Sequence, residues 1–384
     1  MKKRTINPII YIIMCVLLSA CSGGKQNSFL HKVGGDTLKL RYAENLIIVK
    51  YKDYSEVTVL NPWKKGEVLG RYVLTANADS MKREGIDDKA IVQTPLSRLL
   101  VGTAVHCALF EELDSKDAVA GVCESEYINL KFVKEGVASG TIADCGSGMQ
   151  PNTERVIAMS PDAIFLSPYE NSAGYGKVLQ RGIPIIEVAD YMEKSPLGRS
   201  EWMIFYGMLV GKEAEAREIF YDVERKYNEY KTMAAQQETH PKVMMDKMVQ
   251  TNWFLPGGRS TLGQILADAH CHYVYAETQV SGSVEQSFEQ VLQKGVDADI
   301  WLMRYNMGDN TTFSLADLSK ENSKYKLFEA FKKGNVYACD PSSTGFFEQT
   351  PFHPERLLRD FLLIVHPNVT LDNKATIFFK KLGV

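Results

Sequence analysis

Residues 152–166, NTERVIAMSPDAIFL, combine a short helical pattern with a buried strand and decide the fold class. The first half, 152–159, has helical spacing, and the sequence Ser-Pro-Asp then ends the helix. The second half, 163–166, is a continuous apolar run, which is typical of a strand covered on both faces of its sheet. A helix that leads directly into such a strand predicts an α/β architecture.

The same alternation of apolar runs and helical stretches continues on both sides of this segment. Apolar runs predict further strands at residues 99–102, 118–122, 184–188, 243–249, 300–303 and 336–338. Helical spacing predicts helices at residues 106–113, 176–181, 260–269, 287–294, 324–332 and 354–365. Ser260 and Ser287 are expected N-caps, and Gly334 is expected to end a helix. Strands that alternate with helices form largely parallel sheets with right-handed crossovers.

Two further segments complete the predicted architecture. Residues 200–237 repeat apolar side chains at three- and four-residue steps, which indicates one long helix or two helices divided at Gly211. Residues 37–75 alternate apolar and polar side chains, which favours short antiparallel strands. The predicted fold class is α/β, with two Rossmann-like lobes of parallel sheet joined by a long linking helix and preceded by a small antiparallel β segment. The predicted boundaries are 1–20 for a lipoprotein signal peptide, 21–36 for a flexible tether, 37–96 for the β-rich preface, 97–198 for the N-terminal lobe, 199–238 for the linking helix and 239–384 for the C-terminal lobe.

The first residues of the chain have the pattern of a secretory signal. Basic residues 2–4 precede an apolar stretch, 9–18, that is too short to span a bilayer. The sequence Leu-Ser-Ala-Cys at 18–21 resembles the lipobox of bacterial lipoproteins, and this resemblance implies that Cys21 becomes the lipid-bearing first mature residue. The alternative is an ordinary secreted protein with an incidental cysteine at the cleavage site. The small polar residues that follow favour a flexible tether.

Charge and cysteine usage exclude several classes of protein. The formal net charge is −3, and loss of the three signal-peptide cations takes the mature chain to −6. Because no basic run is present, a nucleic-acid partner is not expected. Five cysteines remain after Cys15 and Cys21 are set aside, and they include no Cys-x-x-Cys pair. We therefore expect buried single thiols rather than a zinc ribbon.

The carboxyl ends of the predicted strands define a candidate ligand site. Ligands of open α/β sheets bind at these ends, and clefts between lobes are favoured sites for small molecules. The residues found there are mostly aromatic, with arginines and a few carboxylates, which suits a bulky and partly apolar ligand. The predicted ligand residues are Thr103, His106, Glu124, Tyr169, Glu170, Trp253, Phe254, Arg259, Arg304, Tyr305, Phe346 and Phe347.

Several of these residues also have a purely structural interpretation. Trp253 and Phe254 could pack beneath the turn that follows them, and Arg304 could form a structural salt bridge. His106 lies on an apolar helical turn, where a hydrogen-bonded core histidine is common.

Catalytic and metal-binding motifs are absent from the sequence. There is no Gly-x-Ser-x-Gly elbow, no His-Glu-x-x-His and no Walker loop. His270 and His272 could suggest a metal, but they lie at a helix end away from the strand ends. We therefore predict a binding protein without a cofactor or metal site, and not an enzyme.

Six segments in order resemble the Fe/B12-type periplasmic substrate-binding proteins of ABC importers, over about residues 98–367. The most specific is 155–164, RVIAMSPDAI, which is similar to the family's ERIVALKPDLVI stretch. The others are 182–186, 191–202, 256–269, 297–301 and 331–337. The resemblance implies two α/β lobes on one rigid helix, capture of an iron–siderophore complex, haem or cobalamin, and delivery to a membrane permease.

The resemblance also implies one exposed glutamate on each lobe that docks to permease arginines. Cys107 and Arg259 occupy these positions here, so the chain departs from the pattern, although Glu111 and Glu112 could substitute on the first lobe. The β preface is an addition to the family's plan.

The chain is thus expected to be a monomeric lipoprotein, held on a membrane in the periplasm, that captures an iron chelate. Arg259 and Arg304 favour an anionic siderophore complex. Cobalamin is the main alternative, and a bare zinc or manganese ion, a periplasmic hydrolase and a non-binding scaffold are less favoured.

Overall fold

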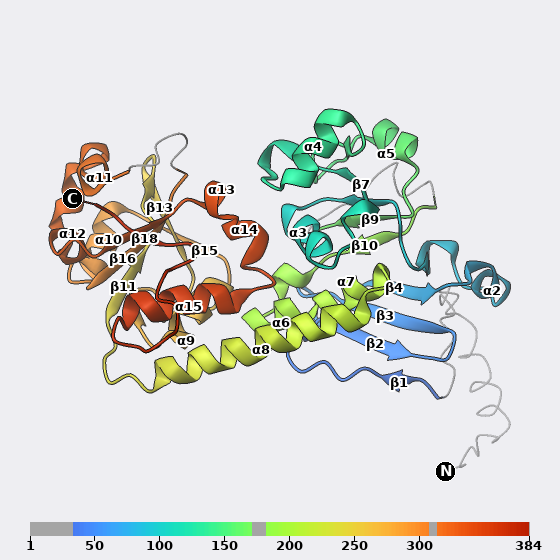
Figure 1. Cartoon of the computed structure of the whole chain (residues 1–384), viewed down its shortest axis with the longest axis horizontal. Coiled ribbons are helices and arrows are strands. Elements are labelled where there is room, and N and C mark those ends of the chain that lie inside the picture. The colour runs from blue at the N-terminus through green and yellow to red at the C-terminus, as the bar shows by residue number, and fades with distance from the viewer. Residues whose placement is uncertain (1–33, 171–181, 307–312, 384) are drawn as a thin grey trace, which may run out of the picture.

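The computed structural model describes residues 34–170, 182–306 and 313–383. Two α/β lobes stand side by side above a long helix, and a separate β-sheet lies below the N-terminal lobe (Figure 1). The predicted α/β fold class is confirmed. The predicted signal peptide, the tether with Cys21 and the predicted helix at 176–181 lie outside the described residues.

The N-terminal sheet has five strands in the order in which they occur in the chain. They are β1 (Asp36–Thr37), β2 (Leu46–Lys50), β3 (Tyr54–Leu60), β4 (Val68–Thr75) and β5 (Ile91–Gln93). The first four pair antiparallel, as predicted, whereas β5 pairs parallel to β4 with Val73 opposite Ile91. A parallel neighbour needs a crossover connection, and helix α2 (Ala78–Arg83) lies in it.

The N-terminal lobe contains a five-stranded parallel sheet in the order β10-β9-β6-β7-β8. Its strands are β6 (Leu99–Val101), β7 (Val119–Val122), β8 (Ala143–Asp144), β9 (Ala163–Leu166) and β10 (Ile185–Glu187). Its helices are α3 (Ala104–Glu112), α4 (Lys131–Ser139) and α5 (Thr153–Met159). All four residues of β9 are buried, as the continuous apolar run predicts.

The C-terminal lobe repeats this plan with two changes. Its main sheet has the order β14-β11-β16-β17-β18, in which β18 is antiparallel, and a three-stranded antiparallel sheet, β12-β13-β15, lies beside it. The strands are β11 (Lys242–Met245), β12 (Met248–Val249), β13 (Asn252–Pro256), β14 (His272–Tyr273), β15 (Ser283–Gln286), β16 (Ile300–Arg304), β17 (Val336–Cys339) and β18 (Lys380–Lys381). The helices are α9 (Thr261–Asp268), α10 (Phe288–Gly295), α11 (Leu315–Glu321), α12 (Glu329–Lys332), α13 (Pro341–Thr344), α14 (Phe346–Gln349) and α15 (Pro354–Val365).

One predicted strand of this lobe is wrong in its extent. The expected strand 243–249 is divided between two sheets, because Asp246 adopts a left-handed conformation with φ of 56° and interrupts the extended backbone. The predicted N-caps are confirmed, since Ser260 and Ser287 each accept a backbone N–H of the next turn. Gly334, with φ of 67°, follows α12 as expected.

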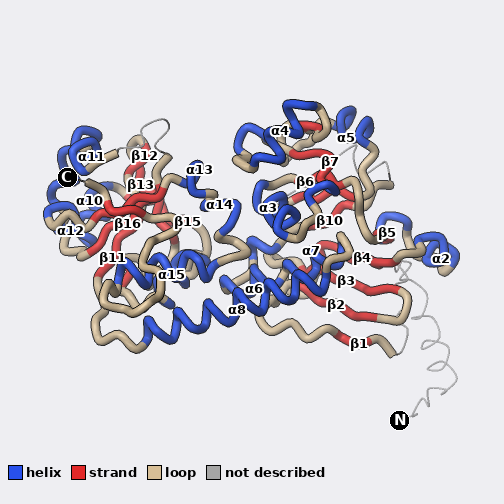
Figure 2. Tube along the Cα trace, viewed as in Figure 1, coloured by secondary structure: helices blue, strands red, loops and turns tan. Residues whose placement is uncertain are grey.

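The linking segment consists of three helices, α6 (Pro196–Glu201), α7 (Met203–Leu209) and α8 (Glu213–Ala235). Gly211 divides α7 from α8 with φ of 73°, a conformation that costs a residue with a side chain about 1–2 kcal/mol. The 23 residues of α8 span about 35 Å. This helix runs beneath both lobes and packs on α7 at one end and on α15 at the other (Figure 2).

Two buried carboxylates, Glu193 just before α6 and Glu201 at the end of α6, bind the backbone of residues 41–45. Glu201 accepts the backbone N–H groups of residues 41–43, at 2.8–3.1 Å. Glu193 accepts the N–H groups of residues 44 and 45, each at 2.9 Å. The N-terminal sheet is therefore part of the rigid body and not a loosely attached module.

In the described part of the chain, no helix has the length and apolarity needed to cross a membrane.

Candidate functional site

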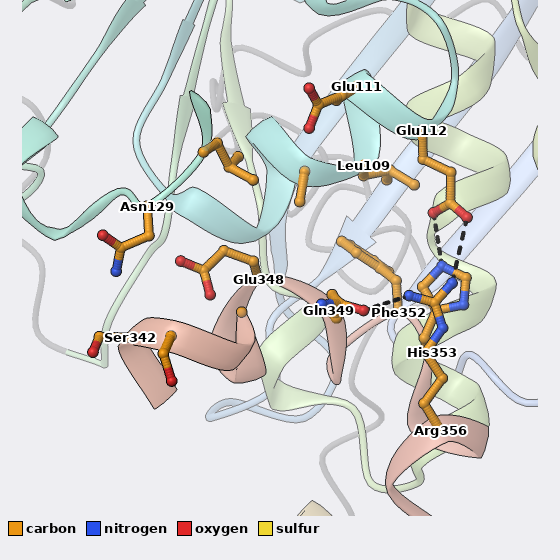
Figure 3. A pocket seen from close by; sticks show the side chains of 14 residues that line it. Leu109, Glu111, Glu112, Asn129, Ser342, Glu348, Gln349, Phe352, His353 and Arg356 are labelled. Atoms are coloured by element: carbon orange, nitrogen blue, oxygen red, sulfur yellow. Dashed lines mark hydrogen bonds and ion pairs between the residues drawn. The ribbon is translucent and has the colours of Figure 1, made fainter. Parts of the chain in front are cut away.

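A cleft of about 340 Å³ separates the two lobes (Figure 3). Helix α3 and the residues before α4 form one wall, and helices α13 and α14 form the other. Helix α3 follows β6, the residues before α4 follow β7, and α13 follows β17, so the walls are built by segments that come after strands of both main sheets. The lining residues are Ala108, Leu109, Glu111, Glu112, Asn129, Leu130, Ser342, Ser343, Gly345, Glu348, Gln349, Phe352, His353 and Arg356.

Aromatic packing between the lobes closes the base of the cleft. The Phe352 ring lies edge-on to His106 and Tyr206, with centroids 5.8 and 5.9 Å apart. The hydroxyl of Ser200 on α6 donates to the Phe352 carbonyl at 3.0 Å. Phe352 of the C-terminal lobe therefore contacts both the N-terminal lobe, at His106, and the linking segment, at Ser200 and Tyr206.

A buried polar network lies beneath this contact and is centred on Asp190. Its carboxylate accepts from His106 Nε2 at 3.1 Å, from Arg199 Nε at 2.9 Å and from the Tyr206 hydroxyl at 2.8 Å. Burial alone would raise the pKa of Asp190, but His106 and Arg199 outweigh it and lower the pKa to about 2. His106 is only 2% exposed, and its other ring nitrogen lies 2.6 Å from Thr103 Oγ1. Both of its nitrogens are used inside the core, which favours the structural interpretation of His106, and its contact with a ligand stays a prediction.

A second network joins the lobes at the rear of the cleft. His353 donates from Nε2 to Glu112 at 2.7 Å and from Nδ1 to Glu355 at 3.0 Å. Burial opposes a charge on His353, but the hydrogen bonds to Glu112 and Glu355 outweigh it and raise its pKa. Burial likewise raises the pKa of Glu112, whereas His353 and Arg356 lower it, and the net direction is downward. These shifts favour an ionised Glu112–His353 pair between α3 and the start of α15.

The Glu112–His353 pair affects one of the two residues predicted to dock to a permease. Glu112 has a partner within the molecule, so it is poorly placed to meet a permease arginine. Glu111 is exposed at the rim of the cleft and stays a docking prediction.

None of the twelve predicted ligand residues lines this cleft. Trp253 is fully buried and donates to the Met245 carbonyl at 3.0 Å, because the alternation along β13 turns it inward and leaves Phe254 44% exposed. Arg304 donates from Nε to Asp246 at 3.0 Å. Phe346 is 4% exposed and packs on neighbouring phenylalanines. The structure thus favours the structural alternatives for Trp253 and Arg304, and it places Phe346 in the core.

The other predicted ligand residues keep access to solvent. Their contact with a ligand stays a prediction, and Tyr169, Glu170 and Tyr305 stand close in sequence to residues outside the described ranges. The set comprises Thr103, Glu124, Tyr169, Glu170, Phe254, Arg259, Tyr305 and Phe347.

Sequence reasoning missed three polar residues that line the cleft, namely Asn129, Glu348 and Gln349. Glu348 and Gln349 come directly after the predicted ligand residues Phe346 and Phe347, so extending the prediction by one helical turn would have found them. Asn129 lies seven residues beyond the end of β7, and no spacing rule places it opposite α13.

The described residues include five cysteines, and all of them except Cys271 are buried. Cys107, Cys123, Cys145, Cys271 and Cys339 are free thiols. Burial raises the pKa of Cys123, Cys271 and Cys339 to about 12, which makes them unreactive. Over the same ranges no group of three or more His, Cys, Asp or Glu residues is placed to hold a metal ion.

Two α/β lobes on a helical linker, with a cleft between their strand ends, define the class of two-lobed solute-binding proteins. A family model described as periplasmic binding protein matches residues 103–343, and the chain belongs to this family. Members of the family bind solutes outside the cytoplasm, so the chain is a binding protein and not an enzyme.

Similarity to individual proteins agrees with this assignment. An uncharacterised lipoprotein of Methanocaldococcus jannaschii is 25% identical over 99% of this chain and 97% of its own length. The iron-uptake system-binding protein of Bacillus subtilis is 26% identical over 52% of this chain and 62% of its own length. A TroA-like periplasmic binding protein from Veillonella parvula has a similar fold, with a TM-score of 0.60, 15% identity and coverage of 76% of this chain and 96% of that one.

Proposed function

We propose that this chain is the lipid-anchored substrate-binding component of an ABC importer and that it captures an iron chelate. The interlobe cleft carries the proposal. Its volume of about 340 Å³ lies in the usual range for small-molecule sites, and residues of both lobes line it. The name of the Bacillus subtilis relative supports iron as the cargo, and the lipobox-like sequence ending at Cys21 supports the anchor.

An iron–siderophore complex suits the cleft better than haem does. Haem iron needs an axial histidine, methionine, cysteine or tyrosine. Among the lining residues of the described cleft only His353 is of these types, and both of its nitrogens are hydrogen-bonded to glutamates. A chelate that already satisfies its iron needs no ligand from the protein.

A ligand screen on the purified mature chain tests the proposal. Ferric siderophore complexes, haem and cobalamin are compared by thermal shift and native mass spectrometry. We expect a ferric chelate to raise the melting temperature, with about 2.7 kcal/mol of stabilisation at a hundred times Kd. Saturable binding of cobalamin without response to any ferric chelate would contradict it.

Two exposed serines offer a matched pair of variants for this screen. Ser343→Trp places an indole in the cleft and is expected to weaken chelate binding at least tenfold. Ser323→Trp adds the same group to an exposed turn of the same lobe that does not line the cleft, and it should bind as the unmodified chain does.

A further inference from the structure

One mostly buried carboxylate in the cleft has no partner among the residues that the structure describes. Glu348 on α14 is only 6% exposed, yet its carboxylate points into the space between Asn129 and Ser342 (Figure 3). No group in the described residues donates a hydrogen bond to it or forms an ion pair with it. The rest of the side chain is covered while the carboxylate oxygens stay accessible from the cleft, so this position can receive a donor from a bound molecule.

The cationic groups and hydroxyls around Glu348 each donate a hydrogen bond to another acceptor. Lys134, the cation behind the opposite wall, donates to the side-chain oxygen of Asn129 at 2.8 Å. The remaining donors and their acceptors are Ser342 Oγ to Asp340 Oδ1 at 2.7 Å, Ser343 Oγ to the Asp340 carbonyl at 3.3 Å, Gln349 Nε2 to the Thr344 carbonyl at 3.1 Å, Arg356 Nη1 to Gln349 Oε1 at 2.6 Å, and His353 Nε2 to Glu112 Oε2 at 2.7 Å.

These pairings give the cleft an uneven charge. At the rear, Glu112 and Glu355 face His353 and Arg356, and the charges offset one another. At the front, Glu348 has no such cation. The two arginines expected to attract an anionic chelate do not change this, because Arg304 is paired with Asp246 and neither arginine lines the cleft.

We propose that Glu348 selects ferric chelates that present an ammonium group or a comparable N–H donor, and so disfavours anionic complexes. The inference rests on the proposed function and names the substrate class of the same site. A charge-assisted hydrogen bond in a cleft is stronger than a neutral one, and its loss costs about tenfold to a hundredfold in affinity.

A pair of ligands with the same iron-binding core tests this directly. One is a ferric trihydroxamate with a free primary ammonium group, and the other is the same complex with that amine acetylated. We expect the mature chain to bind the ammonium form at least tenfold more tightly. In the E348Q variant, which keeps the shape of the side chain, the ratio of the two affinities should fall to about one, mainly through weaker binding of the ammonium form.

The control variant removes a carboxylate elsewhere in the lobe. Glu277 is exposed and does not line the cleft, so E277Q should keep the preference. Equal affinity of the unmodified chain for both ligands would overturn the inference while leaving the importer function intact, as would a preference that E348Q retains. Binding of an anionic ferric tricatecholate in place of the ammonium-bearing complex would also overturn it.

Failure of the proposed function looks different, because then none of the ferric chelates binds. If E348Q does not fold, as judged by circular dichroism, the affinity ratio of the unmodified chain decides the matter by itself.

Discussion

Asp190 shows how a single residue can hold three elements together. It accepts from His106 on α3, from Arg199 on α6 and from Tyr206 on α7, and it is 1% exposed. A buried carboxylate of this kind is stable only because each of its partners is in place.

Replacing Asp190 by asparagine should therefore destabilise the fold. Asp190→Asn keeps the size of the side chain but leaves the partially buried Arg199 without its counter-charge, and we expect a loss of about 3–5 kcal/mol in the free energy of unfolding. Urea denaturation followed by circular dichroism measures this. Asp222→Asn removes a carboxylate from a surface ion pair on α8 and should cost no more than about 1 kcal/mol. Similar losses in both variants would argue against the network.

His353 should make stability depend on pH. Its pKa is raised in the fold, so its contribution is fully present below the unfolded value of about 6.5 and is lost as pH rises through the folded pKa. The charged groups that face it are Glu112, Glu355 and Arg356. We expect His353→Gln to destabilise the chain by about 1–3 kcal/mol in mildly acidic buffer, and by less in alkaline buffer.

The measurement is a series of urea denaturations across that pH range. His272→Gln, which removes an exposed histidine of the same lobe, should give a difference from the unmodified chain that stays small throughout. A His353→Gln effect that is the same at every pH would show that the Glu112–His353 pair is not ionised.

At the scale of elements, the N-terminal sheet owes its position to Glu201. This carboxylate is 2% exposed and accepts three consecutive backbone N–H groups, from Arg41, Tyr42 and Ala43. Three convergent N–H donors make a carboxylate an effective anchor for an extended segment, because no other acceptor is needed for that backbone.

Glu201→Gln should release this segment. The amide can accept fewer of the three bonds and brings its own donors into a buried site, so we expect a loss of about 2–3 kcal/mol. Hydrogen exchange resolved by mass spectrometry should show faster exchange in residues 38–45, with little change in β16. Glu215→Gln, on the exposed face of α8, is the matched control and should leave exchange unchanged. Protection of residues 38–45 in both variants would mean that side-chain packing holds the segment.

The sequence predicted elements well wherever burial alone sets the pattern. The apolar run of β9 and the N-cap at Ser260 lie where they were expected, because both signals are local. The division of strand 243–249 at Asp246 was not predicted, since a left-handed aspartate is stabilised by a partner, Arg304, that lies 58 residues away. The same limit applies to the cleft. Glu348 and Asn129 face each other only because the lobes are packed together.

For the whole molecule, the joined lobes favour a small response to ligand. Helix α8 packs on α15 of the C-terminal lobe and on α7 of the linking segment, α14 already contacts α3 across the gap, and Phe352 and His353 connect the lobes at the cleft. A hinge motion that opens the cleft would have to break all of these contacts at once. Preorganised binding sites of this kind shift by about 1 Å or less when they are occupied.

We therefore expect the lobes to stay nearly fixed when the proposed chelate binds. Small-angle scattering of the mature chain, with and without saturating ferric chelate, should give superimposable curves. His353→Ala, which removes the bridge between Glu112 and Glu355, should leave the free chain more open and make closure by ligand visible. A marked compaction of the unmodified chain would contradict this expectation, because it would mean that ligand binding rearranges α8 and the packing between the lobes.

A small displacement of the lobes also limits how transport can be triggered. In the proposed importer, the permease would then recognise the loaded protein by contacts at the rim of the cleft, where Glu111 is exposed. It could not rely on a large change in the angle between the lobes.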